Sequence, residues 1–386
     1  MKILVTGAKG FVGRNLCAEL NNIASGKRRN SPLPAPPEVI GFDVDSDGSK
    51  LAEYCMEADF VVNLAGVNRP LNEEEFMTGN LGFTSELIAL LEKRGAPCPV
   101  LLSSSTQAEL DNPYGRSKLA AENAVLRYAR RTGSQAYVYR FPNLFGKWCR
   151  PNYNSVVATF CNNIAKGLPI VVNDENRLLR LAYIDDVVEE IIRCIAGKKT
   201  PDNGYCTVDT IYECTLGRLA GLIRGFDECR KSLDIPEVSD DFVRKLNSTY
   251  LSYVSASEAG VFPQMRTDER GSFTELMHLG GMGQVSVNVC RPGHEKGNHW
   301  HHTKTEKFIV VSGEGVILQR RIGDAETARI PVTGEKMQIV DMLPGYTHSI
   351  VNTGDRDLVF IIWANEAFDP ERPDTFFEKV NLEEKE

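Results

Sequence analysis

The sequence predicts two domains of different fold class, a doubly wound parallel α/β sheet followed by an all-β barrel. Three observations lead to this prediction. The chain has 386 residues, more than a single hydrophobic core usually serves. Apolar strand-like runs alternate with helical patterns in the first part, whereas short strand-like runs separated by turn residues fill the last part. All six histidines lie beyond residue 277, so the two parts carry different chemistry.

Composition excludes several classes of function. A hydrophobic share of 42% with 25% charged residues is ordinary for a globular protein. The formal charge of -8 leaves no basic surface for nucleic acid or an anionic membrane. We find no apolar run of membrane-spanning length, and glycines interrupt the N-terminus before a signal sequence could form. Ten cysteines without a C-x-x-C pair indicate reduced thiols, so we predict a cytoplasmic protein.

A glycine-rich turn lies between the first predicted strand and the first predicted helix. The apolar run Lys2–Val5 leads into Gly7, Gly10 and Gly13, and a helical pattern follows to Leu20. In that setting the glycines let the backbone approach a pyrophosphate that lies on the helix N-terminus. The alternative is a turn that only packs a strand against a helix. We disfavour it because four more strands are predicted, at Val39–Val44, Phe60–Leu64, Val100–Leu102 and Tyr137–Tyr139. This part therefore predicts a Rossmann-type sheet.

A serine, a tyrosine and a lysine stand close together after the fourth of the main predicted strands. Ser105 closes a run of three serines, and Tyr114 and Lys118 follow on a predicted helix. Four residues apart, Tyr114 and Lys118 lie on one helix face, so the ammonium can favour the ionised phenol. Such a tyrosine can deliver or remove the proton of a carbonyl/alcohol pair while hydride moves to or from a nicotinamide. The spacing alone is common on helix surfaces, but its position after this strand predicts a catalytic pair.

These motifs resemble the extended short-chain dehydrogenase/reductases, a family of nucleotide-sugar epimerases, dehydratases and reductases. Further matching segments are Asn63–Gly66, Asn80 with Thr84, Arg140–Gly146 and Tyr183–Val187. The resemblance implies that Ser105, Tyr114 and Lys118 are catalytic. It also implies a sugar nucleotide substrate, held by Arg140 and Asn143.

One departure from the family pattern leaves the serine open. The loop that most relatives insert between Ser105 and Tyr114 is absent. Ser105 matches the catalytic position best, and Ser104 and Thr106 are the alternatives.

The predicted cofactor is NADPH, with NADH as the alternative. Asp43 ends the second predicted strand, where an acidic residue usually binds the adenosine ribose and disfavours a 2′-phosphate. Lys9 lies within the glycine turn, where a cation can bind that phosphate instead. The resemblance favours NADPH, and Asp43 argues against it. The predicted cofactor site consists of Gly7, Lys9, Gly10, Phe11, Val12, Gly13, Asp43, Leu64, Ala65, Gly66, Tyr114 and Lys118.

The second domain is predicted to begin at residue 247, after a reductase domain of residues 1–246. Beyond that point the helical patterning fades. Short strand-like runs separated by turn residues follow, at Gly283–Cys290, Lys307–Val311, Gly315–Arg320, Lys336–Asp341, His348–Val351 and Leu358–Ala364. Many short strands at this spacing predict a small sandwich or barrel.

Histidines and one carboxylate gather in this second domain. His299 and His301 lie two apart on extended chain, so both imidazoles point to one face. His302 should point to the opposite face and is not expected to be a ligand. Glu306 and His348 complete a set of borderline ligands that suits Zn²⁺, Fe²⁺, Mn²⁺ or Ni²⁺.

This pattern resembles the cupin, or jelly-roll, fold. Its first motif is matched by His299, His301, Glu306 and Gly313, and its second by Gly345, His348 and Asn352. The second match is imperfect, because Leu343 stands where the usual proline would be and the proline is shifted by one residue. The resemblance implies that His299, His301, Glu306 and His348 bind Zn²⁺. The alternative is a metal-free, lectin-like barrel with surface histidines.

Together the two parts resemble bifunctional enzymes of capsular polysaccharide synthesis on the route to UDP-N-acetyl-L-fucosamine. The segments that carry this resemblance are residues 103–118, 140–156, 268–275, 296–313 and 345–348. It implies that the cupin inverts C3 of a UDP-2-acetamido-2,6-dideoxy-hexos-4-ulose. The reductase domain then reduces C4 with NADPH to a UDP-2-acetamido-2,6-dideoxy-L-talose.

Two other functions stay open. One is a single-activity nucleotide-sugar reductase whose cupin serves dimerisation or sugar binding, and the other is an NAD-dependent 4-epimerase. The base for C3 is not identified, and Lys296, His302 and Tyr346 are the nearby polar candidates. Since cupins commonly pair across their strands, we expect a homodimer.

Overall fold

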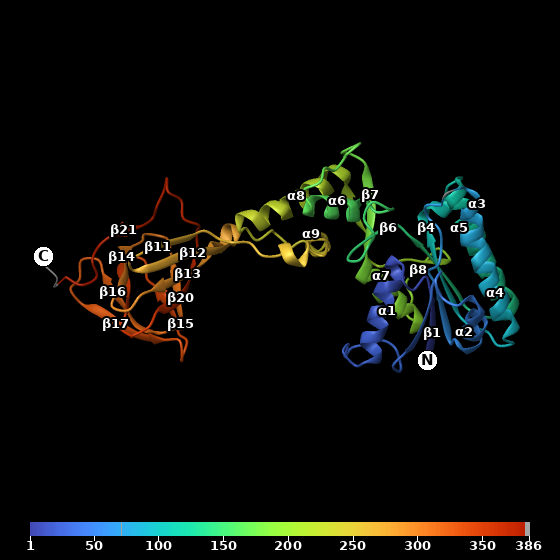
Figure 1. Ribbon diagram of the computed structural model, residues 1–386, viewed down its shortest axis with the longest axis horizontal. Coiled ribbons are helices and arrows are strands. Elements are labelled where there is room, and N and C mark those ends of the chain that lie inside the picture. The colour runs from blue at the N-terminus through green and yellow to red at the C-terminus, as the bar shows by residue number, and fades with distance from the viewer. Residues whose placement is uncertain (71, 383–386) are drawn as a thin grey trace. The chain divides into compact units, whose positions relative to one another are not determined.

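The computed structural model describes residues 1–70 and 72–382, which form two compact units (Figure 1). The first unit comprises residues 1–224 and 238–254, and the second comprises residues 225–237 and 255–386. Among the described residues, no helix combines the length and the apolar character needed to cross a membrane.

The chain passes between the units three times, so the single boundary expected after residue 246 is wrong. That boundary falls inside helix α9 (Asp241–Leu251), which belongs to the first unit. The reason is packing: the ring of Phe242 in α9 packs edge-on against Phe145 and at a tilt against Tyr212 of the first unit. Helix α8 (Leu216–Ser232) begins in the first unit and ends in the second.

A mainly parallel sheet forms the centre of the first unit. Its strand order is β2-β1-β3-β4-β5-β9-β8, and the first five of these strands run parallel. Their bounds are β1 Lys2–Thr6, β2 Glu38–Phe42, β3 Phe60–Asn63, β4 Val100–Ser105, β5 Ala136–Phe141, β8 Pro201–Asp202 and β9 Tyr205–Cys206. The predicted Rossmann-type sheet is confirmed. The chain order reverses between β1 and β3, and ligands bind at such a switch point beyond the carboxyl ends of the strands.

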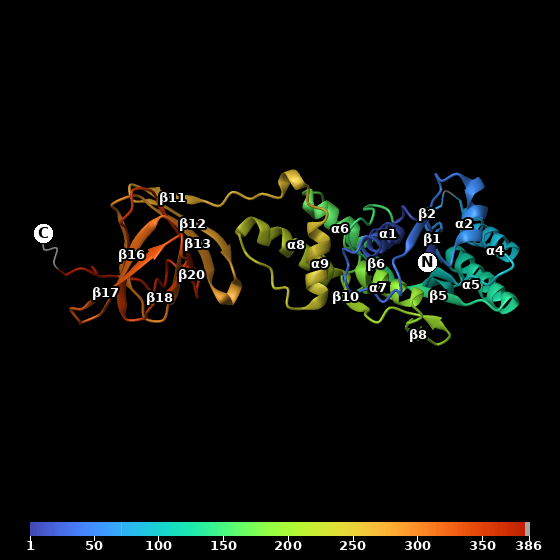
Figure 2. The ribbon, with the colours of Figure 1, turned by 90° about the horizontal axis from the view of Figure 1, so that it is seen from below.

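Helices cover both faces of this sheet (Figure 2). Their bounds are α1 Phe11–Ala24, α2 Leu51–Glu57, α3 Glu74–Phe76, α4 Phe83–Lys93, α5 Pro113–Thr132, α6 Val156–Ala165 and α7 Ile184–Ile195. Single-turn or irregular helices are η1 Gly48–Lys50, η2 Met77–Gly82 and η3 Thr106–Glu109. One apolar core lies between the sheet and helices α2, α4 and α5. A smaller sheet, in the order β10-β7-β6, joins β6 Asn143–Phe145, β7 Leu178–Tyr183 and β10 Tyr212–Thr215.

The second unit is all-β, as predicted, and consists of two antiparallel sheets. The strand orders are β11-β12-β13-β20-β15-β18 and β17-β16-β19-β14-β21. The bounds are β11 Met265–Asp268, β12 Gly271–His278, β13 Gln284–Cys290, β14 Glu295–Trp300, β15 Glu306–Ser312, β16 Glu314–Arg321, β17 Thr327–Thr333, β18 Ile339–Met342, β19 Tyr346–Asn352, β20 Leu358–Ala364 and β21 Phe376–Phe377. Short helices are η4 Ala256–Glu258 and η5 Gly280–Met282. Strands β11, β12, β14, β17 and β21 were not predicted, and β18 begins three residues later than expected.

A bulge in β14 sets which side chains face the interior. Lys296 pairs with Ile350 and His299 pairs with His348, and the register shifts between Gly297 and His299. Gly297 and Asn298 take φ angles of 112° and 61° there, a region that favours glycine and admits asparagine. The extra residue reverses the alternation of faces. As a result, Lys296 and His299 share the inner face although three positions separate them.

The buried Arg320 holds the C-terminal segment against the second sheet. Its side chain is 2% exposed. The guanidinium donates to the carbonyl of Val380 at 2.9 Å, to that of Lys379 at 2.8 Å and to the Glu378 carboxylate at 2.9 Å. The amide of Val380 in turn donates to the side-chain oxygen of Asn298 in the bulge. The segment after β21 therefore fixes the backbone beside His299.

We predict that Arg320→Met lowers the free energy of unfolding by about 3 kcal/mol, because it leaves a carboxylate and several carbonyls without a buried partner. Thermal or urea unfolding of the full chain measures the loss. The neighbouring exposed Arg321 is the matched control, and Arg321→Met should change stability by less than about 0.5 kcal/mol. Equal effects of the two substitutions would contradict the prediction.

Candidate active sites

Ser105, Tyr114 and Lys118 meet at the carboxyl edge of the parallel sheet. Ser105 is the last residue of β4, and the other two lie in the first turns of α5. The side chain of Asn112 caps α5 by accepting from the amide of Gly115 at 2.8 Å. The Ser105 hydroxyl lies close enough to the Tyr114 phenol to lower its pKa, and the Lys118 ammonium lies 5.9 Å from the centre of the Tyr114 ring. The structure thus brings the three predicted catalytic residues together.

Burial favours the neutral forms of both titratable groups. It raises the pKa of the Tyr114 phenol, and the hydrogen bond from Ser105 opposes this rise. Burial also lowers the pKa of Lys118 to about 8, and its ammonium donates to the carbonyl of Ser103 at 3.0 Å. A phenol that keeps its proton can act as an acid toward a carbonyl oxygen.

The two alternative serine candidates lie elsewhere. The hydroxyl of Ser104 donates to the carboxylate of Glu122 at 2.5 Å, in the buried interior behind β4. Thr106 is exposed at the start of η3. Ser105 is the candidate that contacts Tyr114, so the geometry favours it.

Glycines make room at the dinucleotide turn. A Cβ on Gly13 would lie 2.1 Å from the Gly7 carbonyl oxygen, and a Cβ on Gly7 would lie 2.8 Å from the Ala65 nitrogen. Helix α1 follows an N-cap, Gly10, that supplies no side-chain hydrogen bond. Its first amides are therefore open to an anion such as a pyrophosphate.

Gly66, the fourth glycine of the predicted cofactor site, lies beside Lys118. A Cβ on Gly66 would lie 2.7 Å from the side-chain oxygen of Asn80 and 3.2 Å from the Lys118 ammonium. Phe11 and Val12 begin α1, and Leu64 follows β3 directly. The predicted cofactor residues that follow β1 and β3 thus lie at the switch point of the sheet and fit a dinucleotide.

Asp43 and Lys9 lie beside each other at this turn. The Asp43 carboxylate accepts from the Lys9 amide at 2.7 Å and from the Val44 amide at 2.8 Å. The Lys9 ammonium pairs with Asp45, and its side chain is 68% exposed. A surface pair of this kind is weak, so the ammonium is free to turn toward a bound phosphate.

Arg140 and Asn143, the predicted substrate residues, have different surroundings. The Arg140 guanidinium donates to Glu122 at 2.7 Å and to Glu109 at 2.9 Å, and it stacks 3.9 Å from the centre of the Tyr205 ring. Asn143 is exposed at the start of β6. Protein carboxylates already bind Arg140, so its part in substrate binding stays a prediction.

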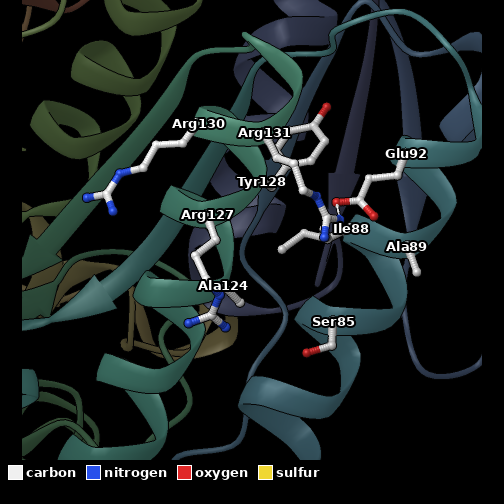
Figure 3. A pocket seen from close by; sticks show the side chains of 9 residues that line it. All are labelled: Ser85, Ile88, Ala89, Glu92, Ala124, Arg127, Tyr128, Arg130 and Arg131. Carbon is white, nitrogen blue, oxygen red and sulfur yellow. Dashed lines mark hydrogen bonds and ion pairs between the residues drawn. The ribbon is translucent and has the colours of Figure 1, made fainter.

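A groove on the first unit lies away from these residues. Its volume is about 520 Å³, and Figure 3 shows its lining side chains on α4 and α5. It is lined by Ser85, Ile88, Ala89, Glu92, Ala124, Arg127, Tyr128, Arg130 and Arg131. Among the described residues that line it, none belongs to the predicted sites.

The four predicted metal ligands converge inside the second unit. The ligand atoms of His299, His301, Glu306 and His348 all lie within 4.8 Å of one another. His299 and His348 face each other across β14 and β19, whereas Glu306 opens β15 in the other sheet. The Glu306 carboxylate lies 3.5 Å from the His301 Nε2 and 3.3 Å from the His348 Nε2.

Several nitrogens of this cluster are buried without a partner. They are the Nε2 of His301 and both ring nitrogens of His348, which have no hydrogen bond among the described residues. Buried polar atoms in proteins are normally paired. Unpaired imidazole nitrogens beside a buried carboxylate therefore fit a divalent metal ion.

Asp374 orients His301 and the chain that follows it. The backbone carbonyl of Asp374 is hydrogen-bonded to the Nδ1 of His301, which leaves the Nε2 for an ion. Its carboxylate accepts from the amides of His302, Thr303 and Lys304. No local sequence pattern indicates Asp374, which lies 73 residues from His301 in a segment without a recognisable motif.

The charges in the cluster also suit a cation. Burial, with His348 nearby, lowers the pKa of His299 to about 4, so this imidazole is neutral at pH 7 and offers a lone pair. Burial alone would raise the pKa of Glu306, but the imidazoles of His301 and His348 close to its carboxylate hold that pKa well below its ordinary value. The cluster thus supplies an ionised carboxylate beside neutral imidazole.

The neighbouring His302 is turned away from the cluster. Its ring lies 4.6 Å from the Trp300 ring and 5.0 Å from the Phe376 ring, centre to centre. This is the opposite face of the strand, as its position next to His301 predicts.

A cavity of about 270 Å³ opens onto the cluster. Its lining includes His299 and Glu306, and of the three candidate bases it includes Lys296. The Lys296 ammonium donates to the Ser272 carbonyl at 2.8 Å, and burial lowers its pKa. Lys304 also lines the cavity, 3.5 Å from the Glu306 carboxylate. The cluster therefore has an accessible side with ammonium groups next to it.

Models of two protein families match the chain. The model of the NAD dependent epimerase/dehydratase family matches residues 3–205. The model of the polysaccharide biosynthesis C-terminal domain matches residues 266–376. The first match covers the parallel sheet and the second covers the all-β unit.

Relatives share both units with this chain. A UDP-2-acetamido-2,6-beta-L-arabino-hexul-4-ose reductase of Pseudomonas aeruginosa is 42% identical over 376 residues, which are 97% of this chain and 98% of the relative. A crystal structure of the capsular polysaccharide assembling protein CapF from Staphylococcus aureus matches with a TM-score of 0.91 and 46% identity, over 98% of this chain and 100% of that chain. A UDP-glucose 4-epimerase of Thermotoga maritima, 18% identical with a TM-score of 0.53, covers only 66% of this chain and 98% of its own, and shares the fold of that part alone.

We predict that the parent protein binds one divalent ion per chain and that His348→Ala lowers its metal affinity at least about tenfold, because a buried ligand is lost. Elemental analysis after dialysis against a metal buffer measures this. His302→Ala is the matched control, since it removes a neighbouring imidazole that faces away from the cluster, and it should bind metal like the parent. Equal metal content in the parent and His348→Ala would refute the assignment.

Proposed function

We propose that this chain is a bifunctional UDP-sugar enzyme. It belongs to the NAD dependent epimerase/dehydratase family and, over nearly its whole length, to the group of proteins that includes CapF. Its general activity is the reduction of a UDP-linked keto sugar. In more detail, we propose that the second unit is a metal-binding cupin, which first inverts C3 of a UDP-2-acetamido-2,6-dideoxy-hexos-4-ulose. The first unit then reduces C4 to the L-talo product, a precursor of capsular or O-antigen polysaccharide.

The observation that supports two activities is the presence of two separate sites in one chain. Tyr114 and Lys118 lie at the carboxyl edge of the parallel sheet, and His299, Glu306 and His348 lie inside the all-β unit. Each set handles protons in a different way. A reductase needs only the first, so the second calls for a further reaction or a binding role.

In the first unit, Tyr114 is the proton donor for the C4 oxygen. Its buried phenol keeps its proton, and the Ser105 hydroxyl holds it in place. Lys118, next to the ring, stabilises the phenolate that remains after transfer. A bound nicotinamide supplies the hydride. NADPH is the proposed donor, because Lys9 can reach a 2′-phosphate.

In the second unit, the cavity beside the cluster is the proposed place of C3 inversion. A divalent ion held by His299, His301, Glu306 and His348, for which we propose Zn²⁺, polarises a carbonyl oxygen when it is bound. Such an ion would make the adjacent C3–H acidic enough for a side chain to remove its proton, and return of a proton to the opposite face would complete the inversion. Lys296 lines the cavity and has a pKa lowered by burial, so it supports this role better than His302 or Tyr346.

Two other functions make different demands on the same sites. A reductase whose all-β unit only binds sugar or pairs subunits would not exchange the C3 proton. A 4-epimerase would return its hydride and consume no reduced cofactor. The presence of a Ser-Tyr-Lys set in one unit and a His-Glu cluster in the other supports the bifunctional enzyme. We also propose that the enzyme acts as a homodimer.

The deciding experiment is a proton NMR incubation of a UDP-4-keto-6-deoxy-N-acetylhexosamine in D₂O, with and without NADPH. We expect deuterium at C3 without cofactor and stoichiometric oxidation when NADPH is added. Reduction without any C3 exchange would leave a single-activity reductase. Turnover without net cofactor oxidation would indicate a 4-epimerase.

Tyr114→Phe should lower the rate of C4 reduction by at least about 100-fold, because the phenol proton is needed there. Exchange at C3 should continue, since the cluster lies in the other unit. NADPH oxidation and C3 deuterium uptake are followed in one sample, so each serves as the control for the other. Joint loss of both activities would show that the sites do not work independently.

The ratio of kcat/KM for NADPH over NADH should exceed about ten and should fall about tenfold in Lys9→Ala, because a charged contact to the 2′-phosphate is lost. Steady-state kinetics with both cofactors measure it. Lys27→Ala removes an exposed lysine of the loop after α1 and is the matched control. A preference of the parent protein for NADH would instead show that Asp43 governs the ribose site.

A further inference from the structure

A row of polar side chains lines the cavity of the second unit along β13. Gln284, Ser286 and Asn288 face inward and are 5%, 1% and 5% exposed. The valines between them face outward. The inner faces of packed sheets are ordinarily apolar, and Phe308, Ile350 and Phe360 make this interior apolar elsewhere. A polar row in such a place needs a partner.

Within this row, the side-chain amide nitrogen of Asn288 lacks a hydrogen-bond partner. Its Nδ2 is buried and has no hydrogen bond among the described residues. By contrast, Gln284 accepts from the amide of Phe368. Asn352, another buried asparagine of this unit, donates to the carbonyls of Cys290 and Arg356. Leaving a buried amide donor unpaired destabilises a protein, so Asn288 is costly unless a ligand satisfies it.

Two aromatic rings flank Asn288. In the strand register it lies opposite Phe273 of β12 on one side and Phe360 of β20 on the other. Residues paired in this way share a face of the sheet, and all three side chains line the cavity. The Asn288 amide is therefore a hydrogen-bonding group that lies between two phenyl rings.

The same cavity reaches the metal ligands. Gln284 lies in register with Ala364, which pairs in turn with Glu306. Asn288 stands four residues further along β13, roughly 13 Å from that row. Glu306 and Asn288 nevertheless line one cavity of about 270 Å³, so both side chains face a sugar that is bound there.

On the basis of the proposed function, we infer that Asn288, Phe273 and Phe360 form a subsite for the 2-acetamido group of the sugar. An amide of the protein matches the acetamido carbonyl in polarity, and the two rings match its methyl group. A hydroxyl in place of the acetamido group would leave the rings without an apolar partner. A diphosphate would call for cations rather than phenyl rings.

Asn288→Leu is the informative variant, because leucine has a similar shape and no hydrogen-bonding group. If the amide serves only the ligand, the variant should unfold at the same or a higher temperature than the parent. Its kcat/KM for C3 exchange of the 2-acetamido-4-keto sugar should fall about 10–100-fold, and that of the 2-hydroxy analogue should change less than about threefold. Val289→Ala, at the outward-facing neighbour, is the control and should leave both values unchanged.

Equal losses with both sugars, or no loss with either, would overturn the inference. So would a lower unfolding temperature, which would show that the amide supports the fold. If the parent protein exchanges C3 in neither sugar, the proposed epimerase is wrong and the subsite is tested separately, by calorimetric titration of the full chain with UDP-N-acetylglucosamine and UDP-glucose. Weaker binding of the acetamido ligand alone in Asn288→Leu supports the subsite, and unchanged binding of both rejects it.

Discussion

Both sites depend on one constraint: each contains polar groups that are buried away from water without a full set of hydrogen-bond partners in the protein. Lys118 is buried beside Tyr114, and the unpaired nitrogens of His301 and His348 lie inside the all-β unit. Such burial is unfavourable, and a fold keeps it only where a ligand supplies the missing partner. In each unit the same desolvation also sets the protonation state, since it keeps the Tyr114 phenol protonated and the His299 imidazole neutral.

The backbone makes these placements possible at a few positions where side chains are excluded or the strand register is broken. Because residue 66 is a glycine, the side chains of Asn80 and Lys118 can occupy the space beside its backbone. In the all-β unit, the bulge at Gly297 and Asn298 brings Lys296 and His299 to one face. Arg320 and the C-terminal segment fix that bulge from outside. Precision at each site therefore depends on residues that never contact a ligand, which is typical of sites supported by an outer layer of hydrogen bonds.

The two units suit successive reactions on one type of substrate. The all-β cavity combines a carboxylate–imidazole cluster with Lys296 and an apolar wall, a combination that suits removal of a proton next to a carbonyl. The parallel sheet offers a buried phenol and an open helix N-terminus, which suit hydride transfer with protonation of an oxygen. In the proposed order of reactions inversion precedes reduction, because reduction of the ketone removes the group that makes the neighbouring proton acidic.

The sequence by itself determined the class of each unit and most of the two sites. Period-two and buried apolar runs identified β1 to β5 and β20, and local spacing placed Tyr114 with Lys118 and His299 with His301, because a helix turn and a strand pleat repeat at fixed intervals. Contacts between residues distant in the chain were decided only by the tertiary structure. Arg140 is hydrogen-bonded to Glu122, and Asp374 contacts His301 although 73 residues separate them. Helix α9 packs on the first unit through Phe242. Strand β14 escaped prediction because its bulge breaks the alternation by which strands are recognised. No local pattern encodes such pairings, since they depend on which surfaces meet once each unit has folded.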